Sequence, residues 1–170
     1  MSSLPPPDVT RQLAYFAADL DFADLPPAVI AHGKLAILDG LGVILQGATL
    51  PWSQMVADLA IADGGRGEAT ILGRGVKVPA AAATLANATA GHAFELDDIH
   101  RDSIVHPNSI VVPVAVNMAE RAGGGDGRTA LTAIVAGYEV ANRIGAAAGT
   151  DLLLRGFHPQ GTAGAIASAV

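Results

Sequence analysis

Apolar residues recur every three or four positions along most of the chain, which is the spacing of one face of an α-helix. Leu13, Phe16 and Leu20 share a face in this way, and Thr10 is placed to cap the helix that they predict over residues 11–20. Proline is well tolerated in the first turn of a helix, and it opens several of the later segments. Further helices are predicted over residues 27–46, 52–62, 79–93, 107–121 and 128–148, and from 159 onward.

One segment departs from the helical pattern. Residues 68–78 carry short apolar and β-branched runs on either side of Gly73, which predicts a small extended hairpin. The fold class is therefore predicted to be all-α, with six or seven helices and one short β-hairpin-like excursion. Residues 1–9, rich in Ser and Pro, are expected to form a flexible arm, and residues 10–170 a helical domain. The last helix reaches the end of the chain without a stop signal, so we expect the domain to be truncated there.

The composition is unusual for a soluble domain. Hydrophobic residues make up 51% of the chain and charged residues 15%, whereas about 25% charged is typical. This content of apolar residues excludes a disordered chain. It also predicts either that much of the surface is buried against something else or that the chain is not a complete unit.

Charge and cysteine content exclude several function classes. The net charge is −6 and the ten Lys and Arg are scattered, so no nucleic-acid partner is predicted. The absence of cysteine excludes a disulfide scaffold and a thiolate zinc site, and fits a cytoplasmic location. The longest charge-free runs contain Thr, Asn, His or Pro, so neither a membrane span nor a signal peptide is predicted.

Two His-Pro pairs are the first candidates for chemistry. His106 and His158 each precede a proline that is predicted to open a helix. The free backbone N–H groups at such helix starts favour an anion, and two imidazoles beside them suit acid–base chemistry on a carboxylate. Short polar side chains follow each pair: Asn108, Ser109, Gln160 and Thr162. The alternative interpretation is that each histidine only caps its helix.

An acidic run over residues 95–102 has three interpretations. If the run is helical, Glu95, Asp98 and Asp102 share a face as a solvated helix end. A metal site is conceivable from Asp97, Asp98, His100, Asp102 and His106. The spacing of the aspartates also resembles the magnesium motif of class I terpenoid synthases, but the sequence has neither their second metal motif nor an aromatic-lined pocket.

Four motifs in order resemble the MmgE/PrpD family. They are Gly-His-Ala-Phe-Glu-Leu-Asp-Asp at 91–98, His-Pro at 106–107 leading into Val-Val-Pro at 111–113, Gly-Tyr-Glu-Val at 137–140, and Gly-Phe-His-Pro-Gln-Gly-Thr at 156–162. The resemblance implies a large helical domain followed by a smaller α/β domain. It also implies a homodimer and catalysis without metal or organic cofactor. This chain would be the N-terminal part of the helical domain.

The resemblance is carried over residue by residue. His106 and His158 match the two active-site histidines of the family, and Asp98 matches the end of its Asp-Asp pair. Glu95 stands where the family usually has aspartate, and Ile99 stands where its decarboxylase has threonine. The predicted catalytic residues are His106, His158, Glu95 and Asp98. The predicted substrate-binding residues are Asn108, Ser109, Gln160 and Thr162, and no metal is predicted.

The function implied is that of a lyase or isomerase acting on a small di- or tricarboxylate. Dehydration of 2-methylcitrate, by removal of a proton α to a carboxylate, is the default reaction. The family also includes cis-aconitate decarboxylase and an iminodisuccinate epimerase. The chain alone lacks the later basic residues of the family site and is predicted to be inactive. The alternatives are a catalytically inactive fragment or helical dimerisation module, and a magnesium-dependent terpenoid-type enzyme.

Overall fold

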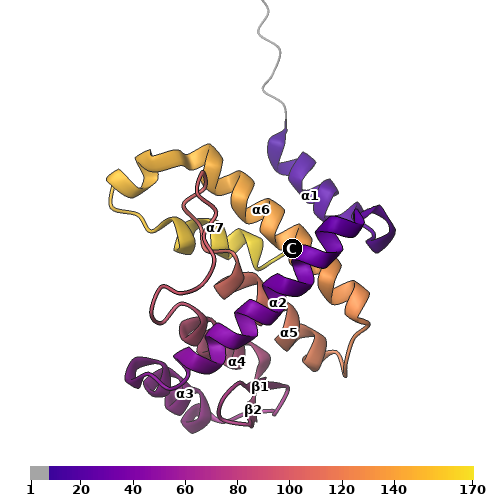
Figure 1. The fold of residues 1–170 in the computed structure, drawn as a ribbon. Coiled ribbons are helices and arrows are strands. Elements are labelled where there is room, and N and C mark those ends of the chain that lie inside the picture. The colour runs from indigo at the N-terminus through magenta and orange to yellow at the C-terminus, as the bar shows by residue number, and fades with distance from the viewer. Residues whose placement is uncertain (1–7) are drawn as a thin grey trace, which may run out of the picture.

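The computed structural model describes residues 8–170, and these residues form a helical domain (Figure 1). Within them lie seven α-helices, one 3-10 helix and one two-stranded antiparallel hairpin, which confirms the predicted fold class. The elements are α1 (Val9–Asp19), η1 (Phe22–Asp24), α2 (Pro27–Gly47), α3 (Pro51–Asp63), β1 (Ala69–Ile71), β2 (Val76–Val78), α4 (Ala80–Gly91), α5 (Asn108–Arg121), α6 (Gly127–Leu154) and α7 (Pro159–Ala167).

The predicted boundaries are wrong at two places. Asp8, and not Thr10, caps α1, because its side chain accepts a hydrogen bond from the Arg11 N–H. Of the predicted arm, residue 9 therefore belongs to the first helix, residue 8 caps it, and residues 1–7 lie outside the described residues. The helix predicted over 128–148 continues to Leu154 in α6. It is interrupted at Gly149, whose φ of 60° and ψ of −165° break the helical path.

Helices α4 and α5 lie at the centre of the domain. Helix α4 packs against α2, α3, α5 and β1, whereas α5 also contacts α6 and α7. One buried apolar cluster joins α3, the hairpin and α4, and a second joins α5, α6 and α7. His92 ends α4, His106 precedes α5, and His158 begins α7, which packs on α5 and α6, so the core fixes their backbone positions.

Small residues let the helices approach closely. At Gly47 the end of α2 lies directly against the backbone of Ala90 in α4, and a Cβ atom there would overlap the Ala90 carbonyl oxygen. The glycine is required here by space, because it lies inside a helix and has no unusual backbone angles. The high content of small apolar residues is thus explained in part by helix contacts of this kind.

We expect Gly47→Ala to lower the free energy of unfolding by about 2–3 kcal/mol, because the neighbour is rigid backbone. Gly42→Ala is the matched control in the same helix, since nothing lies within 4 Å of a Cβ atom there. The control is expected to raise the stability by up to about 1 kcal/mol through helix propensity. Urea unfolding followed by circular dichroism measures both. Equal effects of the two substitutions would contradict the close α2–α4 approach.

The hairpin is joined to α5 through Glu120. Its carboxylate accepts hydrogen bonds from the N–H and Oγ1 of Thr70, both at 2.6 Å, and lies 2.7 Å from Nζ of Lys77. The bond to Lys77 and those to Thr70 lower the pKa of Glu120 to about 2. The carboxylate therefore stays ionised through ordinary pH values and holds the hairpin against α5.

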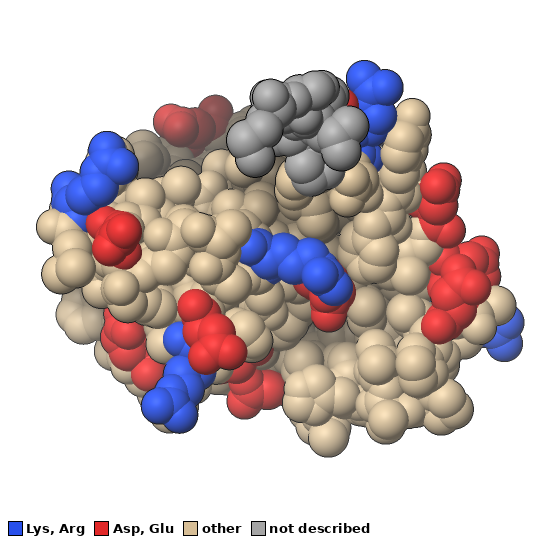
Figure 2. Space-filling view, turned by 90° about the horizontal axis from the view of Figure 1, so that it is seen from above, with Lys and Arg blue, Asp and Glu red and all other residues tan. Residues whose placement is uncertain are grey.

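Much of the outer surface of the domain is apolar. On α2 and α3 the exposed large side chains are Leu35, Leu38, Leu45, Trp52, Met55 and Leu59. The view in Figure 2 shows charged side chains scattered between broad uncharged areas. By length and composition α2 could cross a membrane, but within the fold it contacts α4, α5 and α6. The predicted surplus of apolar surface is therefore present on the folded domain.

Candidate functional site

Three histidines from different elements lie together. The ring centroid of His92 is 4.8 Å from that of His106 and 6.1 Å from that of His158. His92 is the C-cap of α4, His106 precedes α5 by two residues, and His158 is the N-cap of α7. The predicted location of His106 and His158 at helix starts is confirmed. His92 was not among the predicted site residues, although it stands in the first family-like motif.

The buried carboxylate of Asp97 lies beside two of these imidazoles. Its side chain is 1% exposed, and its Oδ2 is 3.0 Å from Nδ1 of His92 and 3.5 Å from Nδ1 of His106. A proton on Nδ1 of His92 is therefore donated to Asp97, which leaves Nε2 as the basic nitrogen. Nδ1 of His106 is buried without a hydrogen bond and faces the same carboxylate. Asp97 thus fixes the orientation of the His92 ring and lies opposite the Nδ1 atom of the His106 ring.

Glu95 lies on the other side of the same two rings. Its Oε1 is 3.4 Å from Nε2 of His92, and its Oε2 is 3.9 Å from Nε2 of His106. The side chain is 70% exposed, so it faces the open side of the cluster. Glu95 also has a positive φ of 57°, a conformation that costs free energy for a residue other than glycine. This backbone conformation places an exposed carboxylate near Nε2 of both His92 and His106.

Asp98 is engaged within the protein. One carboxylate oxygen accepts a 2.9 Å hydrogen bond from the Asn108 N–H at the start of α5, and the other accepts one of 2.9 Å from the hydroxyl of Tyr138. Burial raises the pKa of Asp98, and these two hydrogen bonds oppose that rise. Burial and the neighbouring Asp98 raise the pKa of Tyr138, so its hydroxyl stays a donor. Asp98 therefore connects the acidic loop to α5 and α6.

The acidic run is not a helix, contrary to one of its three interpretations. Residues 92–107 form turns, with an isolated bridge between His100 and Val105. Ile104, like Glu95, has a positive φ, of 54°. Asp97 and Asp98 consequently meet different partners, and the two do not converge as the magnesium motif would require. His100 contacts Ser103 Oγ at 3.0 Å and takes no part in the histidine cluster.

The four predicted substrate-binding side chains make hydrogen bonds inside the protein. Asn108 is fully buried, and its amide donates to the Ala36 carbonyl at 3.0 Å and to Asp39 at 3.1 Å. Ser109 Oγ donates to the His106 carbonyl. Gln160, which lies in α7, donates to the same carbonyl and to Ser109 Oγ. Thr162 Oγ1 donates to the His158 carbonyl, one turn back. Their shared structural effect is to fix the helix ends that carry His106 and His158.

One group of side chains has donor atoms suitable for a metal ion. His92, Asp97 and His106 each offer one ligand atom, and these atoms all lie within 4.8 Å of one another. Two imidazoles and one carboxylate form a donor set for a borderline divalent cation such as zinc. Catalysis without metal stays a prediction.

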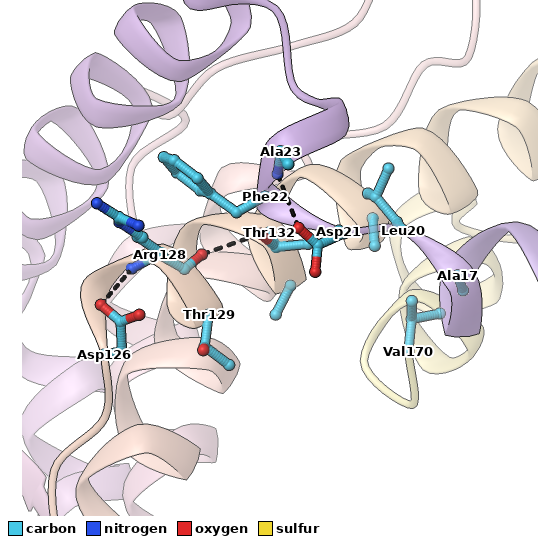
Figure 3. A pocket seen from close by; sticks show the side chains of 12 residues that line it. Ala17, Leu20, Asp21, Phe22, Ala23, Asp126, Arg128, Thr129, Thr132 and Val170 are labelled. Carbon is cyan, nitrogen blue, oxygen red and sulfur yellow. Dashed lines mark hydrogen bonds between the residues drawn. The ribbon is translucent and has the colours of Figure 1, made fainter.

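A hollow of about 530 Å³ lies elsewhere, between α1, η1 and α6 (Figure 3). Its polar groups serve local structure. Asp21 caps η1, Asp126 caps α6, and the Arg128 guanidinium lies 5.3 Å from the ring centre of Phe22. No histidine lines this hollow, so the histidine cluster is the better candidate for acid–base chemistry.

The fold and the site together define a helical domain that presents a histidine–carboxylate cluster at the ends of three helices. The sequence model of the MmgE/PrpD N-terminal domain matches residues 11–170, and the chain belongs to this family. It is 33% identical over 167 residues to cis-aconitate decarboxylase of Aspergillus terreus, covering 95% of this chain and 34% of that protein. It is 32% identical over 174 residues to cis-aconitate decarboxylase-like protein oryM of Aspergillus oryzae, covering 98% and 36% respectively. The chain thus spans about a third of the length of these relatives.

Proposed function

We propose that this chain supplies the histidine side of the active site of a lyase acting on a small di- or tricarboxylate. The clustering of His92, His106 and His158 over Asp97 is the observation that supports it. Membership of the MmgE/PrpD family and the similarity to cis-aconitate decarboxylases support the same class of reaction. Further groups of the site are proposed to come from sequence beyond these residues in the full-length protein.

The chemistry common to the family's reactions is a proton transfer next to a carboxylate. In dehydration a proton leaves carbon and a hydroxide leaves its neighbour, whereas in decarboxylation carbon dioxide leaves and a proton is delivered to carbon. Both reactions need a base or acid near neutral pH and donors for the negative charge that develops. His106 and His158 are proposed to serve as the acid, the base or the carboxylate partner, with Glu95 beside them. The cluster supports either reaction.

The substrate is tested by turnover of the full-length protein. The first two substrates to test are cis-aconitate, because of the named relatives, and 2-methylcitrate, because of the motif resemblance. Citrate and iminodisuccinate complete the set. We expect one of these four substrates to be turned over. His106→Ala should lower the rate by about 1000-fold. His32→Ala, at an exposed position of α2, should leave the rate unchanged. Wild-type turnover by His106→Ala would remove the proposed role of the cluster.

Two further proposals concern cofactors and assembly. We expect turnover to persist after treatment with EDTA, in line with catalysis without metal. The homodimer is supported by the exposed apolar side chains of α2 and α3, and sedimentation of the full-length protein tests it. A monomer at all concentrations would mean that other parts of the same chain cover this surface. A cytoplasmic location and the absence of nucleic-acid or membrane partners stay predictions from the sequence.

A further inference from the structure

The side chain of Gln160, in α7, bonds both the N–H and the carbonyl of His106, and Ser109 Oγ also donates to that carbonyl. Oε1 of Gln160 accepts a hydrogen bond of 2.7 Å from the His106 N–H. Nε2 of Gln160 donates one of 2.8 Å to the His106 carbonyl and another of 2.6 Å to Ser109 Oγ. Gln160 is only 8% exposed, although 54 positions separate it from His106. All three of the hydrogen bonds that its amide makes therefore go to residues 106 and 109.

His106 needs such a partner because it lies just outside α5. The first backbone hydrogen bonds of the helix run from Ile110 and Val111 to the carbonyl of Pro107. The N–H and carbonyl of His106 thus fall before the helical ladder begins. Leaving backbone polar groups unpaired in a packed interior is costly. Gln160 pairs both groups at once, in the way that a neighbouring strand would.

We propose that Gln160 is a positioning residue that sets the placement of His106 relative to His158. Gln160 lies two residues after His158, in the first turn of α7, so its amide joins the two elements that carry these histidines. A two-point bond fixes the rotation of the His106 peptide as well as its distance. A misplacement of about 1 Å at a reacting group lowers rates by about 100-fold. This inference rests on the proposed function, in which the two histidines act on one substrate.

The chemistry of the contact requires an amide side chain. One end must accept a proton from an N–H, and the other must donate to a carbonyl. Glutamate has the same shape but offers only acceptors when ionised, so its second oxygen would face the His106 carbonyl without a proton between them. Methionine has a similar length and offers neither group. Gln160→Glu therefore removes the bond donated to the His106 carbonyl, Gln160→Met removes both bonds, and each keeps most of the volume.

The experiment compares Gln160→Glu and Gln160→Met with Gln54→Glu in the full-length protein. Gln54 is exposed on α3 and makes one side-chain hydrogen bond, to the Thr49 carbonyl, so it controls for the charge change. We expect both Gln160 variants to lose about 10- to 100-fold in kcat, with KM changing less than threefold. The imidazole NMR signals of His106 and His158 should both shift, whereas the signal of His32 should not.

The outcomes separate this inference from the proposed function. If the wild-type protein turns over none of the four carboxylates, the proposed function fails, but the imidazole signals still test the position of His106. Unshifted His106 and His158 signals in a folded Gln160 variant would overturn the inference, as would unchanged kcat in an active enzyme. Should both variants fail to fold, hydrogen exchange in the wild type decides. A protected His106 amide supports the bond to Gln160, and an unprotected one overturns it.

Discussion

Replacing Asp97 with asparagine is expected to lower kcat of the full-length protein by about 100-fold or more, with the fold retained. Asp97 is the buried group that accepts the Nδ1 proton of His92 and faces Nδ1 of His106. An asparagine in its place can present its NH₂ group to these nitrogens, which favours the opposite tautomer. Nε2 of His92 or His106 would then carry the proton and could no longer act as a base.

The loss from Asp97→Asn should fall mainly on kcat, because the substituted side chain lies behind the rings and not on their open side. Asp63→Asn at the exposed end of α3 is the control for the loss of one charge. Steady-state kinetics with the accepted carboxylate measures both variants. Glu95→Gln offers a contrast, because Glu95 is exposed and faces the Nε2 atoms. Equal rates for Asp97→Asn and wild type would show that the buried carboxylate does not set the tautomer.

Helix periodicity and proline placement predicted most of the fold. Proline opens α2 and α7 as expected, whereas Pro79 and Pro107 lie one residue earlier, as the N-caps of α4 and α5. The hairpin lies where the extended residues and glycines indicated it. The cap of α1 was misplaced because Asp8 and Thr10 are both suitable residues, and only the hydrogen bond to Arg11 distinguishes them. The continuation of α6 past Gly149 was missed because a glycine with a positive φ normally ends a helix.

The site was predicted less completely, for reasons that lie in the acidic loop. Adjacent aspartates carry the same chemistry in a sequence, but the turns of this loop send Asp97 to the histidines and Asp98 to α5 and α6. That division depends on positive φ angles at Glu95 and Ile104, where no glycine signals them. The sequence signal for His92 was its place in the family-like motif at 91–98, although the helix predicted over 79–93 included it.

Hydrogen bonds between distant segments explain why the predicted substrate-binding residues bond other parts of the protein. Asn108, Ser109 and Gln160 were predicted to bind substrate because each follows a histidine at a helix start. Asn108 bonds Ala36 and Asp39, and Gln160 bonds His106 and Ser109, so these pairings span 51 to 72 positions. Local sequence contains no signal for contacts of that range. Polar residues at a predicted helix start thus indicated which side chains lie near His106 and His158, but not which partners they bond.

Asp98 is expected to contribute more to folding than to chemistry, and two substitutions separate these roles. Asp98→Ala leaves the N–H of buried Asn108 and the hydroxyl of Tyr138 without partners, which should lower the free energy of unfolding by about 3 kcal/mol. Tyr138→Phe removes only one of the two bonds and should cost about 1 kcal/mol. Urea unfolding of the two single variants and the double variant measures the coupling.

Asp98→Asn keeps an acceptor for Asn108 and a group that can bond Tyr138, so we expect turnover within threefold of wild type. Burial raises the pKa of Asp98 in the folded state, and the folded protein therefore holds its proton to higher pH than the unfolded chain. The contribution of Asp98 to stability thus falls as pH rises from its ordinary value through the raised one. Asp98→Asn should consequently gain stability relative to wild type as the pH rises from about 4. A folded Asp98→Asn variant with turnover lowered by 100-fold would instead place Asp98 among the catalytic groups, as the family resemblance implies.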